Sequence, residues 1–100
     1  MALVRGIHII AKGDRARARE IARDIAKNQR LLIGSNTMYG AGVYAWQEEF
    51  LPVHLVDQPQ VIFEIDDSQI LPSGARQGCF RIPGRINDYI DVRVLRFSNF

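Results

Sequence analysis

Hydrophobic positions recur along the chain with two different spacings. Five segments either alternate apolar and polar residues or run almost continuously through Val, Ile, Leu and Phe, which is typical of β-strands. These segments are ALVRGIHII, RLLIGSN, PQVIFEIDD, CFRIPGRI and DYIDVRVLRF. Pro83 confines the fourth segment to a sheet edge or a strand end, because proline cannot donate to a strand ladder. The fifth alternates cleanly, and it predicts one strand over residues 88–97.

Residues 15–28, RARAREIARDIAKN, follow the helical spacing instead. Their apolar side chains fall at i, i+3, i+4, i+7 and i+8, which predicts an amphipathic helix, and Asp14 is a suitable N-cap. A second face carries a cation every four residues, and these are Arg15, Arg19, Arg23 and Lys27. Two interpretations of this stripe stay open: a solvated face supported by local ion pairs, or a surface for RNA or phosphate.

One early helix followed by several strands predicts an α+β domain. We expect a curved antiparallel or mixed split β-sheet with one long amphipathic helix and one or more short helices. Residues 1–100 contain no linker or internal repeat, so one domain is expected. No GxGxxG or Walker pattern occurs, which disfavours Rossmann and P-loop nucleotide binding.

Charge changes this picture because it is unevenly distributed. The chain has a net charge of +2, yet residues 1–30, 31–75 and 76–100 carry +5, −6 and +3. The terminal segments could form a basic face for an anionic partner, or basic and acidic surfaces could neutralise each other across the fold.

The sequence offers few metal ligands and no long apolar segment. Cys79 has no intramolecular disulfide partner, and with His8 and His54 it supplies too few spaced ligands for zinc, so no metal is expected. No apolar stretch approaches the roughly 18 residues of a membrane span, and no secretory signal opens the chain. A cytoplasmic protein without a membrane partner is expected.

The stretch TMYGAGVYAW combines glycines with aromatic side chains. Gly40 and Gly42 allow a bend with an open wall, flanked by Tyr39 and Tyr44 and followed by Trp46. A flat heterocycle could stack there, or the aromatics could fill a β-bulge or hairpin corner.

The segment YGAGVYAW resembles the glycine-x-glycine-x-tyrosine motif of the ADP-ribosyltransferase superfamily, in its poly(ADP-ribose) polymerase and diphtheria-toxin-like branch. The order of the other segments is similar too. In that family a strand with His-Gly or Arg-Gly opens the site, a helix follows, and the glycine–tyrosine motif begins the next helix. Here VRGIH corresponds to the first strand and QVIFEID to the strand after the motif.

The resemblance implies an NAD site and gives each matching residue a role. Arg5 and Gly6 would hold the adenylate ribose and the nicotinamide amide, with Gly6 acting through its backbone. Tyr44 would stack on the nicotinamide ring, Gly42 would keep that wall open, and Tyr39 would add to the cofactor-binding surface.

The family's acidic residue falls near Asp88, with Asp91 as a second choice, and it would act together with Tyr44 in catalysis. A carboxylate suits the role because departure of nicotinamide leaves an oxocarbenium-like sugar. Two departures are visible: the family's usual glutamate is replaced by the shorter aspartate, and Arg5 stands where this branch usually has histidine. The resemblance therefore predicts an NAD-dependent ADP-ribosyltransferase with an unknown protein or nucleic-acid acceptor.

Two other functions remain open from the residues alone. One is a non-catalytic module that binds a nucleotide in the same place or RNA on the arginine stripe. The other is a small interaction domain in which the glycine–tyrosine bend is structural. Self-association as a homo-oligomer would add stability to a chain this small.

Overall fold

The computed structural model describes residues 2–10, 14–33, 42–72 and 77–98. The strands are β1 (Leu3–Ile9), β2 (Arg30–Leu32), β3 (Gly42–Gln47), β4 (Gln60–Asp66), β5 (Leu71–Pro72), β6 (Cys79–Pro83), β7 (Tyr89–Asp91) and β8 (Arg93–Ser98). The helical elements are α1 (Arg15–Asn28) and the 3₁₀ helices η1 (Glu48–Phe50), η2 (Val53–Leu55) and η3 (Asp67–Gln69). Tyr39 and Gly40 lie outside the described residues.

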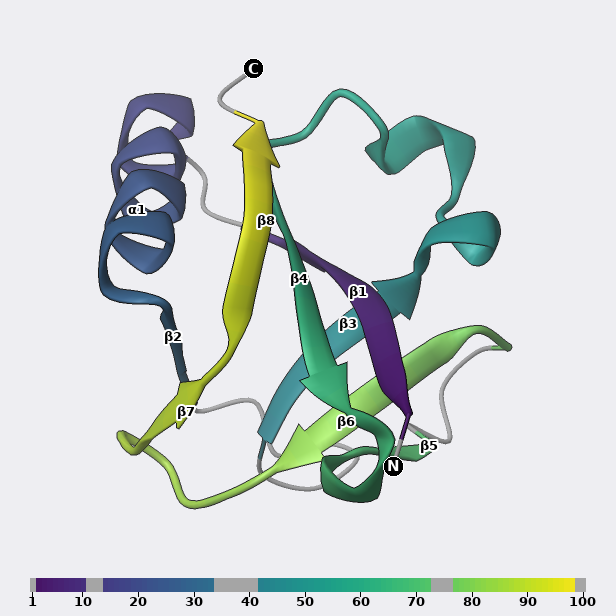
Figure 1. Ribbon diagram of the computed structural model, residues 1–100. Coiled ribbons are helices and arrows are strands. Elements are labelled where there is room, and N and C mark those ends of the chain that lie inside the picture. The colour runs from purple at the N-terminus through teal and green to yellow at the C-terminus, as the bar shows by residue number, and fades with distance from the viewer. Residues whose placement is uncertain (1, 11–13, 34–41, 73–76, 99–100) are drawn as a thin grey trace.

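Six strands form one antiparallel sheet in the order β5-β6-β3-β1-β4-β8, and β2 pairs with β7 in a separate two-stranded sheet. Figure 1 shows α1 beside β8, with β2 and β7 below the helix. The large sheet is not closed into a barrel, because β5 and β8 are both edge strands. The predicted α+β class and the antiparallel sheet are therefore confirmed.

The helix has the predicted bounds and the predicted cap. The Asp14 carboxylate accepts a hydrogen bond from the Ala16 N–H at 2.9 Å, which satisfies one of the free donors of the first turn. Ala18 and Ala22 are buried and pack with Val61 of β4, so their small side chains bring the helix close to the sheet. Gln29 ends the helix in the left-handed conformation, with φ 55°.

The main core lies on the side of the large sheet that α1 covers. Phe63 of β4 and Phe80 of β6 meet edge to face, with ring centroids 6.5 Å apart. Leu31 of β2 and Val92 close this core from the side of the small sheet. The small sheet and the helix thus cover one face of the six strands.

The single strand predicted over residues 88–97 is wrong, because the chain changes partner at Val92. Residues before it form β7 and pair with β2, whereas residues after it form β8 and pair with β4. The Val92 N–H donates to the Gln29 carbonyl at 3.1 Å, and its side chain is buried. Alternation of polar and apolar residues continues through this break, so the pattern alone does not reveal it.

Candidate functional site

Strand register assigns the side chains of the large sheet to its two faces. A Cβ at Gly6 would lie 2.6 Å from Phe80 Cζ, so Gly6 faces the aromatic core. Arg5 and Ile7 must then point to the opposite face, since side chains alternate along a strand. Ile7 pairs with Trp46, which places Trp46 on that opposite face as well.

Five side chains on this second face define what we call the Tyr44 face. They are Arg5, Tyr44, Trp46, Cys79 and Arg81. Tyr44 is directly opposite Arg81 in the β3–β6 register, and Trp46 is directly opposite Cys79. Tyr44 and Trp46 are half-buried, whereas Val43 and Ala45, which alternate with them along β3, are buried in the core. Tyr44 therefore lies outside the aromatic core, as a ligand-stacking ring would have to.

Part of the same face is covered by the chain between β3 and β4. Gln60 is 5% exposed, and its Nε2 donates to the carbonyls of Val56 at 2.8 Å and Gln58 at 3.1 Å. These bonds hold the segment after η2 against β1 and β4, where Ile7 and Ile62 are buried. The β3–β6 half of the Tyr44 face keeps more solvent access.

A fork between β1 and β3 lies next to Tyr44. The two strands pair at Gly6 and Ile7, while β1 continues to pair with β4 as far as Ile9. At the fork the His8 Nδ1 lies 2.9 Å from the Tyr44 carbonyl oxygen. A carbonyl can only accept, so Nδ1 carries a hydrogen and donates it to this bond. Burial lowers the pKa of His8 through desolvation, partly offset by this hydrogen bond.

Arg5 is on the Tyr44 face but is held by acidic neighbours. Its guanidinium lies 3.4 Å from a carboxylate oxygen of Glu48, with both side chains about half exposed. Glu64 of β4 is the direct cross-strand partner of Arg5, and Arg93 of β8 is the partner of Glu64. Charges therefore alternate across the sheet. An exposed pair of this kind contributes about 0–1 kcal/mol, so Arg5 can exchange Glu48 for another anion at little cost.

The two described glycines of the predicted site have structural reasons to be glycine. Gly6 is buried in the central strand beneath Phe63 and Phe80. Gly42 has φ +154°, and a Cβ there would lie 2.3 Å from the Ile82 carbonyl oxygen of β6. The glycine–tyrosine motif begins strand β3, whereas the resemblance implied the start of a helix. The absence of a side chain at Gly42 lets β3 and β6 pair closely at this position.

The acidic residues assigned by the resemblance belong to the small sheet. Asp88 precedes β7; its N–H donates to the Arg85 carbonyl and its own carbonyl accepts from Ile33. Asp91 is the cross-strand partner of Arg30, whose guanidinium stacks 3.9 Å from the Tyr89 ring centre. Tyr44 is in the large sheet, so strand pairing does not bring either aspartate beside it.

Glu48 is the carboxylate that the fold brings to Arg5, and no motif or spacing in the sequence indicates this pairing. The two residues are far apart in the chain and meet because β1 and β3 pair antiparallel. Within the described ranges, no cluster of three or more His, Cys, Asp or Glu residues could hold a metal ion. No helix in those ranges is long and apolar enough to cross a membrane.

Comparisons of the chain with protein-family models, curated proteins and solved structures find no match.

Proposed function

We propose that the domain binds NAD across the Tyr44 face and acts as an NAD-dependent ADP-ribosyltransferase. The observation that carries the proposal is the register that aligns Tyr44 with Arg81 beside the β1–β3 fork and places Arg5 on the same face, level with Glu48. A stacking ring and two guanidinium groups are suited to a dinucleotide, which offers flat bases and a charged pyrophosphate. The sequence resemblance to the superfamily supports the same ligand.

In this proposal Tyr44 stacks on the nicotinamide ring and Arg81 pairs with the pyrophosphate. The guanidinium of Arg5 exchanges Glu48 for the ribose or phosphate oxygens of the ligand. The C–N glycosidic bond breaks, and nicotinamide leaves with the bonding electron pair. An acceptor nucleophile then gives an electron pair to the ribose carbon and releases its proton to solvent.

A carboxylate must stabilise the positive charge that develops on the ribose. Sequence resemblance assigns this role to Asp88, whereas the fold brings Glu48 next to Arg5 at 3.4 Å. Asp88 and Glu48 are therefore to be compared directly. Since a positioned charge of this kind contributes about 100-fold or more to turnover, the two substitutions are easily distinguished.

The test is nicotinamide release from NAD together with calorimetric NAD binding, measured on the wild type and on single variants. Tyr44→Ala is expected to abolish both, while Tyr89→Ala removes a ring from the small sheet and should leave both unchanged. Glu48→Gln or Asp88→Asn should abolish release but keep binding, according to which one is the catalytic carboxylate. Absence of both release and binding in the wild type would refute the proposal.

Binding without cleavage is the second candidate function. It is favoured by the contacts of Asp88, which tie that residue to Ile33 and Arg85 of the small-sheet region. A module of this kind would bind NAD or ADP-ribose, lose binding in Tyr44→Ala, and release no nicotinamide under any condition. Calorimetry and the release assay together therefore separate the two functions.

A further inference from the structure

The exposed surface of α1 has two flanks of different charge. At 100° per residue, Arg15, Arg19, Arg23 and Lys27 wind along one flank, which we call the basic flank. Glu20 and Asp24 lie on the other flank with Arg17, whose guanidinium pairs with Glu20 at 3.2 Å. Lys27 lies three residues after Asp24 and Arg23 three residues after Glu20, so the two acids border the C-terminal half of the basic flank, and Arg15 and Arg19 lie further from them around the helix. All four cations of that flank are exposed.

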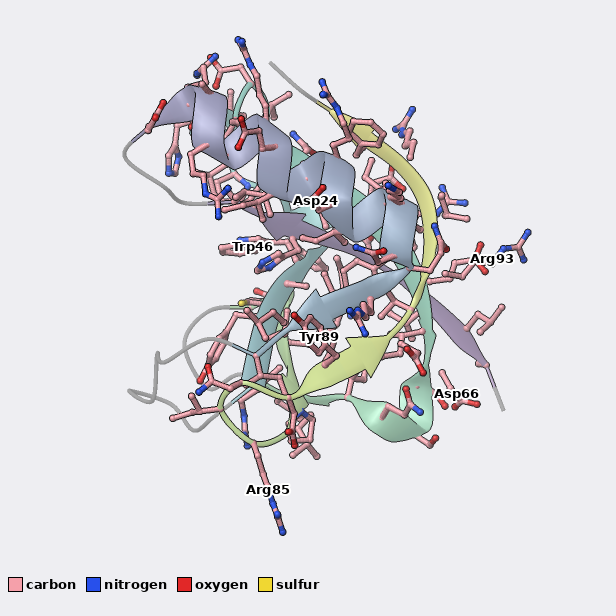
Figure 2. The ribbon with its side chains drawn as sticks, turned by 90° about the vertical axis from the view of Figure 1, so that its left-hand side faces the viewer. Asp24, Trp46, Asp66, Arg85, Tyr89 and Arg93 are labelled. Atoms are coloured by element: carbon pink, nitrogen blue, oxygen red, sulfur yellow. The ribbon has the colours of Figure 1, made fainter. Side chains whose placement is uncertain are left out.

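Strand β8 lies beside the helix and carries two arginines, whose sheet face follows from the β4–β8 register. α1 packs more extensively on β8 than on any other described element, and β8 carries the exposed residues Arg93 and Arg96. Figure 2 shows Arg93 extending from the outer edge of β8, away from Tyr89. Arg93 is the cross-strand partner of Glu64 and Arg96 that of Ile62, so both arginines belong to the sheet face opposite α1, at its outer edge, and are not part of the basic flank.

The remaining acids lie elsewhere in the fold. Residues 31–75 contain six Asp or Glu and no Lys or Arg. Among them, Glu48 and Glu49 belong to η1, and Figure 1 shows the teal segment of η1 and η2 on the side of the molecule opposite α1. The exposed helix therefore carries a net positive charge and η1 a negative one, although Glu20 and Asp24 lie on α1 and Asp91 lies in the small sheet.

We propose that the basic flank of α1 binds the phosphate backbone of nucleic acid. From Arg15 to Lys27 the flank is about 18 Å long at 1.5 Å per residue. Each strand of duplex DNA carries one charge per about 3.4 Å of its axis, so this length spans about five phosphates of one strand. Three of the four cations of the flank are arginines, whose planar guanidinium can bind two phosphate oxygens at once.

The basic flank carries no aromatic side chain, so it offers no ring on which a base could stack. Contacts of this kind fix position on the backbone without reading sequence. The surface shares no residue with the Tyr44 face. The tests of nucleic-acid binding and of NAD binding are therefore independent of each other.

The test measures fluorescence anisotropy of a labelled 20-base-pair DNA duplex and a single-stranded RNA of equal length, over a series of NaCl concentrations. The wild type should bind with a Kd of about 1–100 μM near physiological salt, weakening steeply as salt rises. Neutralising Arg23 and Lys27 together, with R23Q and K27Q, should reduce the duplex salt slope by about 1.8. At 0.1 M salt this corresponds to roughly eightfold weaker binding per charge removed.

The matched control is R17Q with R85Q, which removes the same net charge from the acidic flank and the opposite end of the molecule. Figure 2 shows Arg85 pointing away from α1 at that far end. The control should retain at least half of the wild-type affinity, and all variants should keep the wild-type circular dichroism spectrum. Equal weakening by the control, no binding at 50 mM NaCl, or equal competition by polyglutamate would each overturn the proposal.

Discussion

Substitution of Gly6 by alanine tests whether this residue is needed for packing. A Cβ at Gly6 would lie 2.6 Å from Phe80 Cζ and 2.8 Å from Phe63 Cζ. Carbon atoms pack best at about 3.5–4.0 Å, so both rings would have to move by about 1 Å within a close-packed core. Phe80 is 3% exposed and Phe63 is fully buried, which leaves neither ring an easy route outward.

Overpacking of this size costs about 1–3 kcal/mol. Alanine recovers about 0.4–1 kcal/mol by restricting the unfolded chain, so Gly6→Ala should lower the unfolding free energy by about 1–2 kcal/mol net. For a domain of this size we expect Tm to fall by about 5–15 °C in calorimetry. NAD binding per folded molecule should not change if Gly6 acts only in the core.

A double-mutant cycle with Phe80→Leu isolates the clash. Leucine lacks the Cζ atom that the new methyl group would meet, so the double variant should be more stable than the sum of the single effects by about 1 kcal/mol. An unchanged Tm in Gly6→Ala, or strict additivity with Phe80→Leu, would refute the packing argument. Loss of NAD binding with unchanged Tm would assign Gly6 to the ligand instead.

Two further substitutions probe polar contacts. Because burial lowers the pKa of His8 below its ordinary value of 6.5, the unfolded state binds more protons than the folded state below that pH. The urea midpoint should therefore fall as pH decreases from about 6.5 toward the folded-state pKa of His8. His8→Phe should abolish this pH dependence, and the control His54→Phe should retain it. Equal pH dependence in the two variants would contradict the assignment to His8. Gln29→Ala removes the side-chain oxygen that accepts from the Val94 N–H at 2.8 Å, and should cost about 1–2 kcal/mol in urea unfolding. Gln29→Asn shortens the side chain but keeps both an acceptor and a donor, and Gln29→Glu keeps the acceptor but loses the Nε2 donor to the Ala26 carbonyl at 2.6 Å. A Gln29→Ala variant as stable as the wild type would show that these bonds contribute little.

Local sequence patterns predicted the elements whose structure depends on residues close together in the chain. The helix could be placed because Ala18, Ala22 and the Asp14 cap all depend on neighbouring residues. The strand after Asp88 could not, because the change of partner at Val92 depends on a bond from the distant Gln29. Periodicity describes which side of a strand is apolar, but it does not say which strand lies beside it.

The same limit applies to the candidate site. Alternation predicted that Arg5 and His8 lie on opposite faces, and the register places them so. The meeting of Arg5 with Glu48, and the alignment of Tyr44 with Arg81, depend on pairing between segments far apart in sequence. No residue type or spacing within either segment indicates its partner.

The place of β1 in the sheet has a consequence for folding kinetics. This strand is early in the chain but central in the sheet, and its two neighbours are formed by residues 42–47 and 60–66. Both pairings close long loops before they gain any packing energy, which raises the entropic barrier to folding. We expect the isolated helix to form in about a microsecond, whereas the sheet should assemble in milliseconds to seconds. Until β1 is in place, the edges of β3 and β4 stay open to pairing with other chains, so refolding yield should fall as protein concentration rises.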